Sequence, residues 1–319
     1  MFGLLPKGHL ARREAIWFWI FILPWVIGFI LFRGGPILAS LFLSFTEYNV
    51  ASSPEWVALD NFTRLASDPI FIKSLQVSVY YTFLSVPLGI VVSLAMAMML
   101  NQKGVPFLGI LRTLYYIPAL VAGSVAVALL FQWILNPSFG ILNYLLGLFV
   151  GPNGIIPLGI VGPRWFFDPN WVVPSFVLMS LWGFGGSMLL YLAGLQGVPT
   201  TLYEAATIDG ANAWHRFRNV TLPMISPVIL FTFITGMIGS FQVFTPAYIV
   251  SGGQGGPAYA SMFYVLYLYL NAFRRYRFGY ASAQAWLLFL VILVLTVFAF
   301  RASRRAVYYE SATEGEEMI

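Results

Sequence analysis

Charged residues are scarce in this sequence. Of its 319 residues, 9% are charged and 59% are hydrophobic, whereas soluble globular chains carry roughly a quarter charged residues. Because so few charges cannot cover a surface that faces water, the composition indicates that the solvent of this chain is lipid. The formal net charge of +5 comes from basic residues scattered beside apolar stretches. It gives no grounds for expecting a nucleic-acid partner.

Cysteine is absent, which excludes disulfides, zinc thiolates and thiolate catalysis. Histidine is nearly absent: His9 lies in the N-terminal tail and His215 lies far along the chain, in a charged segment. No pair has the spacing of metal ligands or of a catalytic triad. Because an enzyme inside the membrane needs such groups, we expect no catalytic activity and no metal site in this chain.

Lysine is also rare, and none of Lys7, Lys73 and Lys103 follows a glycine. A Walker-type phosphate loop needs glycine directly before its lysine, so the chain itself is not expected to bind and hydrolyse ATP. Residues 253–258 formally fit the dinucleotide pattern G-x-G-x-x-A. Pro257 and the lack of a flanking strand instead favour a flexible loop there.

Long stretches without charge predict membrane-spanning helices, each of which needs roughly 20 predominantly apolar residues. We predict an all-α integral membrane protein with six transmembrane helices at 15–38, 74–100, 109–133, 171–195, 224–248 and 282–302. Turn-forming residues at 136–138 and 251–257 argue against a seventh helix. Cleavage of the first span as a signal peptide is the lesser alternative, because no clear small-x-small cleavage site follows it.

Basic residues flank the first and last spans. They are Arg12, Arg13, Arg301, Arg304 and Arg305. Positive residues beside spans favour the cytoplasm, and an even number of spans puts both termini there. We therefore expect cytoplasmic tails at 1–14 and 303–319 around a transmembrane domain at 15–302. Ten of the 17 basic residues fall inside on this assignment, a modest bias that the outside cluster at 274–277 opposes.

The predicted spans have no Asp, Glu, Lys, Arg or His near their centres. Such groups at mid-membrane usually mark proton relays or ion paths, so a proton-coupled transporter would be hard to power here. Sodium coupling through carbonyls and hydroxyls stays open. If the chain moves solutes uphill, its energy is expected to come from another subunit. The alternative is a self-contained secondary transporter or channel.

One charged segment, Glu204 to Pro223, interrupts the second half of the chain with the residues EAATIDGANAWHRFRNVTLP. Thr201 and Glu204 have the spacing of a capping box. Gly210 can end the helix in a left-handed turn, and Asn212 can cap a second short helix through Val220. We predict a helix, a glycine turn and a helix on the cytoplasmic side between spans four and five. Its local chemistry leaves two readings open, a docking surface and an ordinary solvated loop.

The charged segment carries a family resemblance. Its stretches at 204–206, 209–211 and 221–223 resemble the EAA loop of binding-protein-dependent ABC transporter permeases, and more narrowly of the carbohydrate-uptake permeases. The stretches LSFTEYN at 43–49, DNFTRL at 60–65, GILNYLLG at 140–147 and GGP…FGYASA at 255–283 lie where that family keeps similar residues. The resemblance thus covers nearly the whole chain.

In that family the EAA loop, here 199–223, forms a coupling helix that is seated in a cleft of a separate ATPase. The resemblance implies that the ATPase-coupling residues are Glu204, Ala205, Ala206, Asp209 and Gly210. The alternative for the alanines is that they only fill a helix. ATP and Mg would be bound by the partner ATPase, and this chain would hold no cofactor.

The resemblance also implies partners and a location. They are an ABC ATPase dimer, a second permease subunit, an extracytoplasmic solute-binding protein and the lipid bilayer of a bacterial or archaeal cell (inner) membrane. Sugar permeases often come as two different subunits. This chain resembles the first type, because it has the GGP loop and an acidic tail at 310–317 and lacks a glycine-rich terminal segment.

A path for sugar needs hydroxyl-binding groups and aromatic faces, because sugars have polar rims and apolar planes. The candidate residues are Trp182, Ser187, Ser240, Gln242, Thr245, Tyr248 and Gln284. Hydroxyls that bond to their own helix and aromatics at the membrane interface are the structural alternatives. Gln242 is the strongest candidate, because an amide in hydrocarbon needs a partner. We therefore predict a permease subunit of an ATP-driven importer for a sugar or sugar-like solute, working by alternating access.

Overall fold

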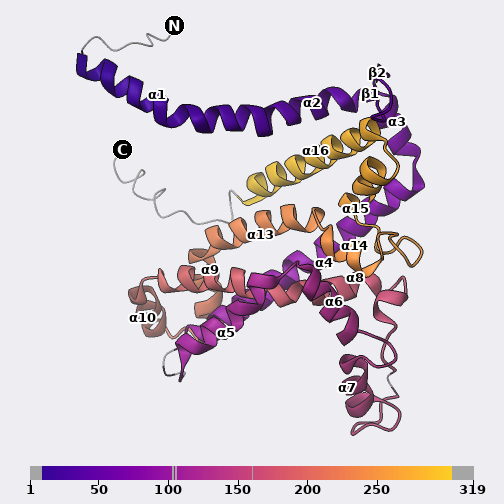
Figure 1. Ribbon diagram of the computed structural model, residues 1–319. Coiled ribbons are helices and arrows are strands. Elements are labelled where there is room, and N and C mark those ends of the chain that lie inside the picture. The colour runs from indigo at the N-terminus through magenta and orange to yellow at the C-terminus, as the bar shows by residue number, and fades with distance from the viewer. Residues whose placement is uncertain (1–8, 103, 105, 160, 304–319) are drawn as a thin grey trace. The chain divides into compact units, whose positions relative to one another are not determined.

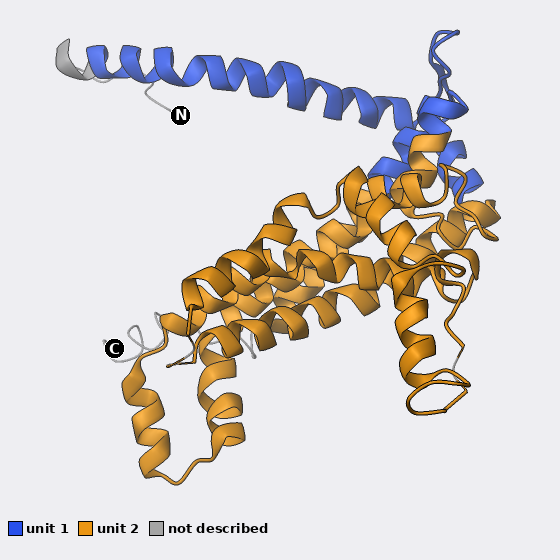
Figure 2. Ribbon diagram, turned by 60° about the horizontal axis from the view of Figure 1, so that its bottom comes forward, with its two compact units in different colours: residues 1–65, 271–287 blue, residues 66–270, 288–319 orange. Residues whose placement is uncertain are grey.

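The computed structural model describes residues 9–102, 104, 106–159 and 161–303, which are predominantly helical (Figure 1). The chain divides into two compact units (Figure 2): residues 1–65 with 271–287, and residues 66–270 with 288–319. We describe each unit by itself. Most of the predicted tails at 1–14 and 303–319 lies outside the described residues.

The first unit begins with a long apolar arm. It consists of α1 (His9–Phe29), a π-helical turn η1 (Ile30–Gly34) and α2 (Gly35–Ser44). The continuous candidate span Arg12–Ser44 is longer than the predicted 15–38. Two short antiparallel strands follow, β1 (Thr46–Glu47) and β2 (Glu55–Trp56), with Thr46 opposite Trp56. Then α3 (Asp60–Ser67) begins.

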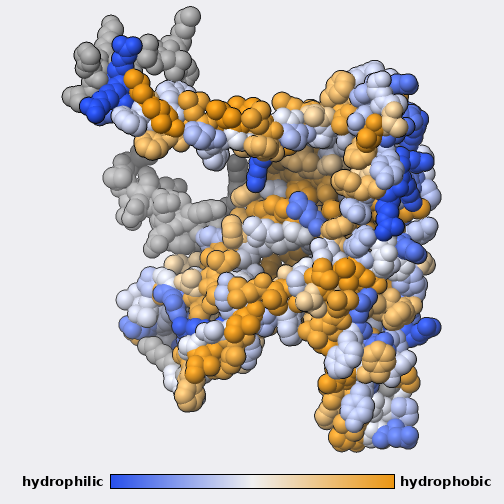
Figure 3. Space-filling view, viewed as in Figure 1, coloured by the Kyte–Doolittle hydropathy of each residue, from blue (hydrophilic) through white to orange (hydrophobic). Residues whose placement is uncertain are grey.

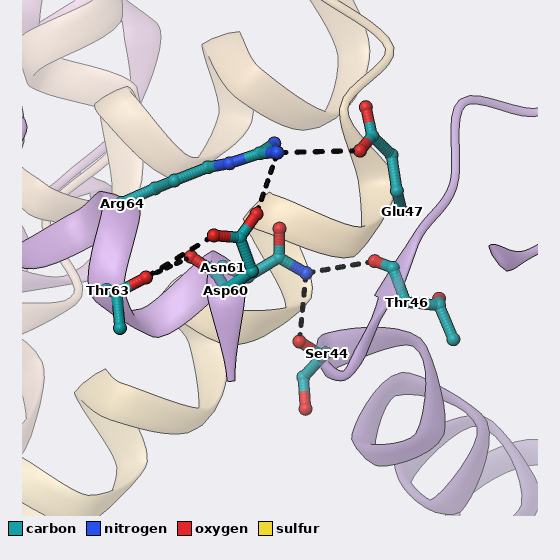
Figure 4. A network of polar contacts seen from close by, with 7 residues as sticks. All are labelled: Ser44, Thr46, Glu47, Asp60, Asn61, Thr63 and Arg64. Carbon is teal, nitrogen blue, oxygen red and sulfur yellow. Dashed lines mark hydrogen bonds and ion pairs between the residues drawn. The ribbon is translucent and has the colours of Figure 1, made fainter. Parts of the chain in front are cut away.

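A polar network holds this part of the first unit together (Figure 4). Asn61 is 2% exposed, and its amide nitrogen donates to the carbonyl oxygens of Ser44 at 3.0 Å and Thr46 at 2.9 Å. Arg64 forms ion pairs with Asp60 at 2.7 Å and Glu47 at 3.6 Å. Because a buried amide without partners is costly, the two bonds of Asn61 join the end of α2 to α3.

The second unit contains most of the remaining elements. They are α4 (Pro69–Leu100), α5 (Leu108–Val121), α6 (Val125–Ile134), α7 (Ile141–Val150), η2 (Trp165–Phe167), α8 (Val172–Ser180), η3 (Leu181–Gly183), α9 (Phe184–Gln196), α10 (Thr200–Ile208), α11 (Ala213–Arg216), η4 (Phe217–Thr221), α12 (Leu222–Met224), α13 (Ser226–Phe241), α14 (Thr245–Val250) and α15 (Tyr264–Tyr269). Two further helices, η5 (Leu270–Arg274) and α16 (Phe278–Ser303), have residues in both units.

Helix α4 is the centre of the second unit and packs against α8, α9, α13 and α15. Asp68 caps its N-terminus by accepting hydrogen bonds from the amides of Ile70 at 2.9 Å and Phe71 at 3.2 Å. Small residues let its neighbours approach closely, as is common between membrane helices. The hydroxyl of Ser93, for example, donates to the carbonyl of Phe184 in α9 at 3.2 Å.

The spans agree with the sequence prediction in number if one bent helix pair counts as a single span. Five helical stretches of the described residues are long and apolar enough to cross a membrane: Arg12–Ser44, Pro69–Leu100, Val172–Gln196, Ser226–Val250 and Phe278–Ser303. The sixth is the pair α5 and α6, which bend by 103° at their junction. An all-α protein with six candidate spans is therefore confirmed.

The predicted continuous helix over 109–133 is wrong, because the chain turns between α5 and α6. Gly123 has a φ of +74°, which ends a right-handed helix and favours glycine. Ser124 then caps α6, its hydroxyl accepting a hydrogen bond from the amide of Val127 at 3.3 Å. Hydropathy alone cannot reveal such a turn, since the residues around it are apolar.

Helix α9 lies so close to α5 that Gly185 leaves no room for a side chain. A Cβ at Gly185 would lie 2.2 Å from the carbonyl oxygen of Tyr115, whereas one at Gly186 would meet nothing within 4 Å. We predict that Gly185→Ala destabilises the protein by about 1–3 kcal/mol through overpacking, and that Gly186→Ala does not. Thermal unfolding of the purified variants measures this, and equal melting temperatures would contradict the close packing.

Candidate functional site

Three helical segments of the second unit are interrupted beside a common space. The interruptions are residues 122–124 between α5 and α6, the η3 turn at 181–183 between α8 and α9, and residues 242–244 between α13 and α14. A cavity of about 440 Å³ is lined by residues of the first and third interruptions and by Ser180, which directly precedes the second. Its lining is Tyr81, Ala122, Gly123, Ser124, Val127, Ala128, Phe176, Met179, Ser180, Gln242, Val243, Phe244, Thr245 and Pro246. We call it the upper cavity.

A second cavity of about 210 Å³ adjoins the first and is called here the lower cavity. Its lining is Tyr81, Ser85, Val86, Gly89, Ile90, Ser93, Ser180, Leu181, Gly183, Phe184, Ser187, Thr232, Gly236, Gly239, Ser240 and Val243. Tyr81, Ser180 and Val243 line both cavities. Neither lining contains Asp, Glu, Lys, Arg or His.

The hydroxyls of the lower cavity are tied to the surrounding helices. Ser240 donates to the carbonyl of Met237 and lies 2.8 Å from the hydroxyl of Thr82. The hydroxyl of Thr232 bonds to that of Tyr191. A hydroxyl that donates to its own helix still has an acceptor lone pair. The arrangement suits a neutral solute with its own hydroxyl donors, and glycines at 89, 183, 236 and 239 leave it space.

Four of the seven predicted path residues line these cavities. Gln242 and Thr245 line the upper one, and Ser187 and Ser240 line the lower one. Their position agrees with a solute path, while contact with a solute stays a prediction.

The other three predicted residues lie elsewhere. The ring of Trp182 packs edge-on against Phe131 with centroids 5.8 Å apart, and the ring of Tyr248 packs against those of Phe244 and Tyr269. Gln284 is fully buried in the first unit, where its side-chain oxygen accepts a hydrogen bond from Asn271 at 3.3 Å. These three side chains line neither cavity.

The sequence prediction missed the contribution of α4 to both cavities. Tyr81, Ser85 and Ser93 of this helix line one cavity or both. The signal was present, because α4 carries serines at 74, 78, 85 and 93 within an otherwise apolar span. The predicted path residues all lie on spans four to six, whereas packing places the second span at the centre of the second unit.

The charged segment forms the predicted helix, turn and helix, with one local error. Helix α10 begins at Thr200 after Pro199, and no side chain caps it. The predicted capping box of Thr201 and Glu204 is therefore wrong. Proline presets a backbone φ that suits a helix start, so the helix begins two residues earlier than predicted and Thr201 lies inside its first turn.

The turn after α10 follows the prediction. Gly210 has a φ of +76°, and the amide of Ala211 donates to the carbonyl of Ala206 at 2.9 Å, as in a glycine-terminated helix. Asn212 then caps α11, its side-chain oxygen accepting from the amide of His215 at 2.9 Å. Residues 217–221 continue as the π-helix η4.

Two hydrogen bonds fix the two helices of the charged segment to each other. The guanidinium of Arg216 donates to the hydroxyl of Thr207 at 3.3 Å, and the hydroxyls of Tyr203 and Thr221 lie 3.0 Å apart. The charged segment is thus a folded element joined to the start of α12. A purely solvated linker would not need such contacts.

The outer surface of the charged segment carries the predicted coupling residues. Glu204, Ala205, Asp209 and Gly210 are exposed, and Ala206 is half-buried. Two apolar side chains that the sequence prediction did not single out are exposed on the same segment: Ile208 at 87% and Trp214 at 62%. Exposed aromatic side chains such as Trp214 are enriched in protein interfaces.

The glycine turn allows a test of this local structure. At Gly210 a Cβ would meet no atom within 4 Å, so Gly210→Ala adds only backbone strain, about 1–2 kcal/mol for a left-handed residue. We predict faster amide hydrogen exchange in α10 of Gly210→Ala and a smaller effect in Gly210→Asn, since asparagine tolerates this conformation. Unchanged exchange in the alanine variant would show that the turn does not hold α10 in place.

Comparisons with known proteins give the family. The profile described as "Binding-protein-dependent transport system inner membrane component" matches residues 85–307. The chain is 40% identical over 97% of its length to "Probable ABC transporter permease protein YesP" of Bacillus subtilis (strain 168), of which 97% is covered. It is 35% identical over 93% of its length to "Lactose transport system permease protein LacF" of Rhizobium radiobacter, of which 97% is covered.

A solved structure shares the fold. A chain of the bacterial alginate ABC transporter, solved in complex with an alginate pentasaccharide-bound periplasmic protein, superposes with a TM-score of 0.77 at 23% identity. The match covers 92% of this chain and 96% of that one. At this identity the likeness concerns the fold alone.

Proposed function

Since the chain belongs to the family of binding-protein-dependent transport system inner membrane components and is a multi-pass permease subunit of such an importer, we propose that it carries a sugar or sugar-like solute. The proposed route runs through the upper and lower cavities. Membership of this family sets aside the alternative of a self-contained secondary transporter or channel.

The chemistry of the two adjoining cavities carries this proposal. The upper cavity has aromatic faces on Tyr81, Phe176 and Phe244 beside the amide of Gln242. The lower cavity is lined by Tyr81 and by six serine and threonine side chains, which are Ser85, Ser93, Ser180, Ser187, Thr232 and Ser240. Aromatic faces suit the apolar planes of sugar rings, and hydroxyls and an amide suit their rims.

The charge of the cavities supports the same substrate class. Their linings contain no Asp, Glu, Lys, Arg or His, so an ionic substrate would enter a poorly compensating environment at a high desolvation cost. Two relatives carry names that refer to lactose and to arabinooligosaccharides. The proposed substrate is accordingly a neutral sugar.

The energy for transport comes, in this proposal, from an ABC ATPase dimer that binds ATP and Mg and receives the charged segment in a cleft. Its support is the exposed surface around Glu204 and Asp209, on a segment held rigid by the bonds of Tyr203 and Arg216. The chain carries no lysine in a phosphate loop, so hydrolysis belongs to the partner.

A movement of the charged segment would reach the lower cavity directly. It follows α9, which contributes Phe184 and Ser187 to that cavity, and leads through η4 and α12 to α13, which contributes Thr232 and Ser240. A shift of both helices against α4 would open or close the cavity. This is the physical basis proposed for alternating access, in which closure of the ATPase dimer is the driving step.

Further partners complete the proposed importer. A second permease subunit would pair with this chain, and an extracytoplasmic solute-binding protein would dock on the loops at 46–72 and 249–277. Both termini would face the cytoplasm, which the basic residues beside the first and last spans support.

Charge reversal on the charged segment tests the coupling role. We predict that Glu204→Lys weakens docking of the ATPase by about 2 kcal/mol or more, roughly thirtyfold, because it places a wrong charge at a desolvated interface. Uptake by the reconstituted transporter would fall accordingly, with membrane insertion intact. Glu14→Lys, the same change at an exposed glutamate of α1, is the control. Full uptake and normal ATPase binding in Glu204→Lys would refute the coupling role.

Filling the lower cavity tests the route. Gly239 lines this cavity, and a Cβ there meets no atom within 4 Å, so Gly239→Leu adds bulk to the cavity without a backbone clash. We predict a large loss of sugar uptake with an unchanged melting temperature. The control is Gly109→Leu on α5, which also has open space and lines neither cavity. Normal uptake by Gly239→Leu would place the route elsewhere.

The substrate class itself needs a separate measurement. The complete transporter is reconstituted with its solute-binding protein, and ATP hydrolysis is measured with candidate ligands. Stimulation by a neutral mono- or oligosaccharide is the expected result. Stimulation by amino acids or inorganic ions alone would contradict the sugar proposal, and sugar uptake into vesicles that lack the ATPase would contradict the proposed energy source.

A further inference from the structure

The segment between α6 and α8 has an unusual composition for a loop. From Asn136 to Pro163 it contains no Asp, Glu, Lys, Arg or His. It includes the ten-residue helix α7 and a return stretch at 151–163. We refer to residues 136–163 as the α7 excursion.

The excursion is folded and closed at its base. The side-chain amide of Asn143 donates to the carbonyls of Pro137 at 3.3 Å and Pro163 at 3.1 Å, and its oxygen accepts from the indole of Trp165 at 2.6 Å. One side chain thus joins both ends of the excursion to the rigid η2 turn. An unstructured loop would not need such a clasp.

The backbone of the excursion satisfies many of its own polar groups. In the return stretch, the amides of Ile155 and Ile156 donate to the carbonyls of Leu148 and Phe149 in α7, each at 2.9 Å. The amide of Gly154 donates to the carbonyl of Gly151 at 3.1 Å. Such internal pairing is a condition for backbone that lies against hydrocarbon, where water cannot replace missing bonds.

The side chains of the excursion are nevertheless exposed in this chain. The large apolar side chains that are more than a third exposed are Phe139, Ile141, Tyr144, Leu145, Leu148, Phe149, Ile155, Ile156, Leu158 and Val161. Figure 3 shows orange, apolar residues along one side of the projecting end that Figure 1 labels α7, beside pale and blue residues. At roughly 25 cal/mol for each Å² of apolar surface, leaving such a patch in water is unfavourable, and exposed patches of this kind mark protein–protein or membrane interaction sites.

Geometry excludes a seventh span. Ten helical residues of α7 extend about 15 Å, half the thickness of a hydrocarbon core. The preceding helix α6 lies at 103° to α5, so the chain has turned away from the direction of α5 before α7 begins. Figures 1 and 2 show the excursion projecting away from α4, α5 and α9.

We propose that the α7 excursion lies in the membrane interface, at the end of α5 opposite the charged segment. Its apolar side chains lie in the boundary between lipid headgroups and acyl chains. Tyr144, which is 69% exposed, and Trp171, which is 42% exposed, are the side chains that anchor it at headgroup level, where aromatic residues gather.

Lipid fits this surface better than a protein does. Protein interfaces surround an apolar centre with a polar rim and about one hydrogen bond per 100–200 Å², whereas this segment has no charged side chain. Hydrocarbon requires only apolar surface and backbone groups that are paired within the protein. The excursion has exposed apolar side chains and internal backbone hydrogen bonds. The clasp at Asn143 would then fix the end of α6, which lines the upper cavity, to the membrane plane.

The absence of cysteine permits a direct test. Single cysteines at Leu148 and Ile155, one on α7 and one on the return stretch, receive a nitroxide label in the complete transporter in phosphatidylcholine–phosphatidylglycerol vesicles. Collision rates with O₂ and with a water-soluble nickel chelate report lipid and water. Phe298 on α16, which is 69% exposed, is the lipid reference, and Ser52 in a polar loop is the water reference. Retained transport shows that each variant folds.

The expected result is a shift of the O₂-to-nickel ratio at both excursion sites to the value found at Phe298. A ratio like that at Ser52 would overturn the proposal and leave the surface in water. Low collision rates with both reagents would also overturn it, because they would show that a protein partner covers the excursion. Agreement between the two sites guards against a local effect of either label.

Discussion

In hydrocarbon, every backbone polar group needs a partner within the protein, so interrupting a helix that spans the membrane costs free energy unless the break borders a cavity. This chain interrupts three helical segments, at 122–124, 181–183 and 242–244, and residues of each break line the upper or the lower cavity. The two cavities therefore lie where the helices are interrupted. The glycine turn at Gly123 and the cap of Ser124 allow the chain to turn there.

The same constraint explains where polar side chains occur. Inside the bundle they are neutral, and most bond locally, as Ser240 does to Met237. Charges gather where water is available, on the charged segment and in the network of Asn61 and Arg64. A transporter without charges in its path cannot couple to a proton gradient easily, which agrees with an importer whose energy enters through the charged segment.

Helix α4 relates these parts to one another. It packs against α8, α9 and α13 and lines both cavities, so it is the fixed wall against which the other helices would shift. The charged segment follows α9 and leads into α13, and its Phe217 and Val220 pack against a core cluster that includes α4 residues. The α7 excursion, in turn, is continuous with α6 at the opposite end of the upper cavity. Force from an ATPase and anchoring by lipid would thus act at opposite ends of one path.

The sequence by itself determined the solvent, the number of spans and the helix–turn–helix of the charged segment. Each depends on local chemistry: apolar length, a glycine with positive φ at 210 and a capping asparagine at 212. Only the tertiary structure decided which side chains share a cavity. It brought Gln242 and Ser240 together with Tyr81 of α4 and left Gln284 buried in the first unit. It also divided 109–133 into two helices. Hydropathy predicts the length of an apolar stretch, but it does not predict a change in the direction of the chain within that stretch.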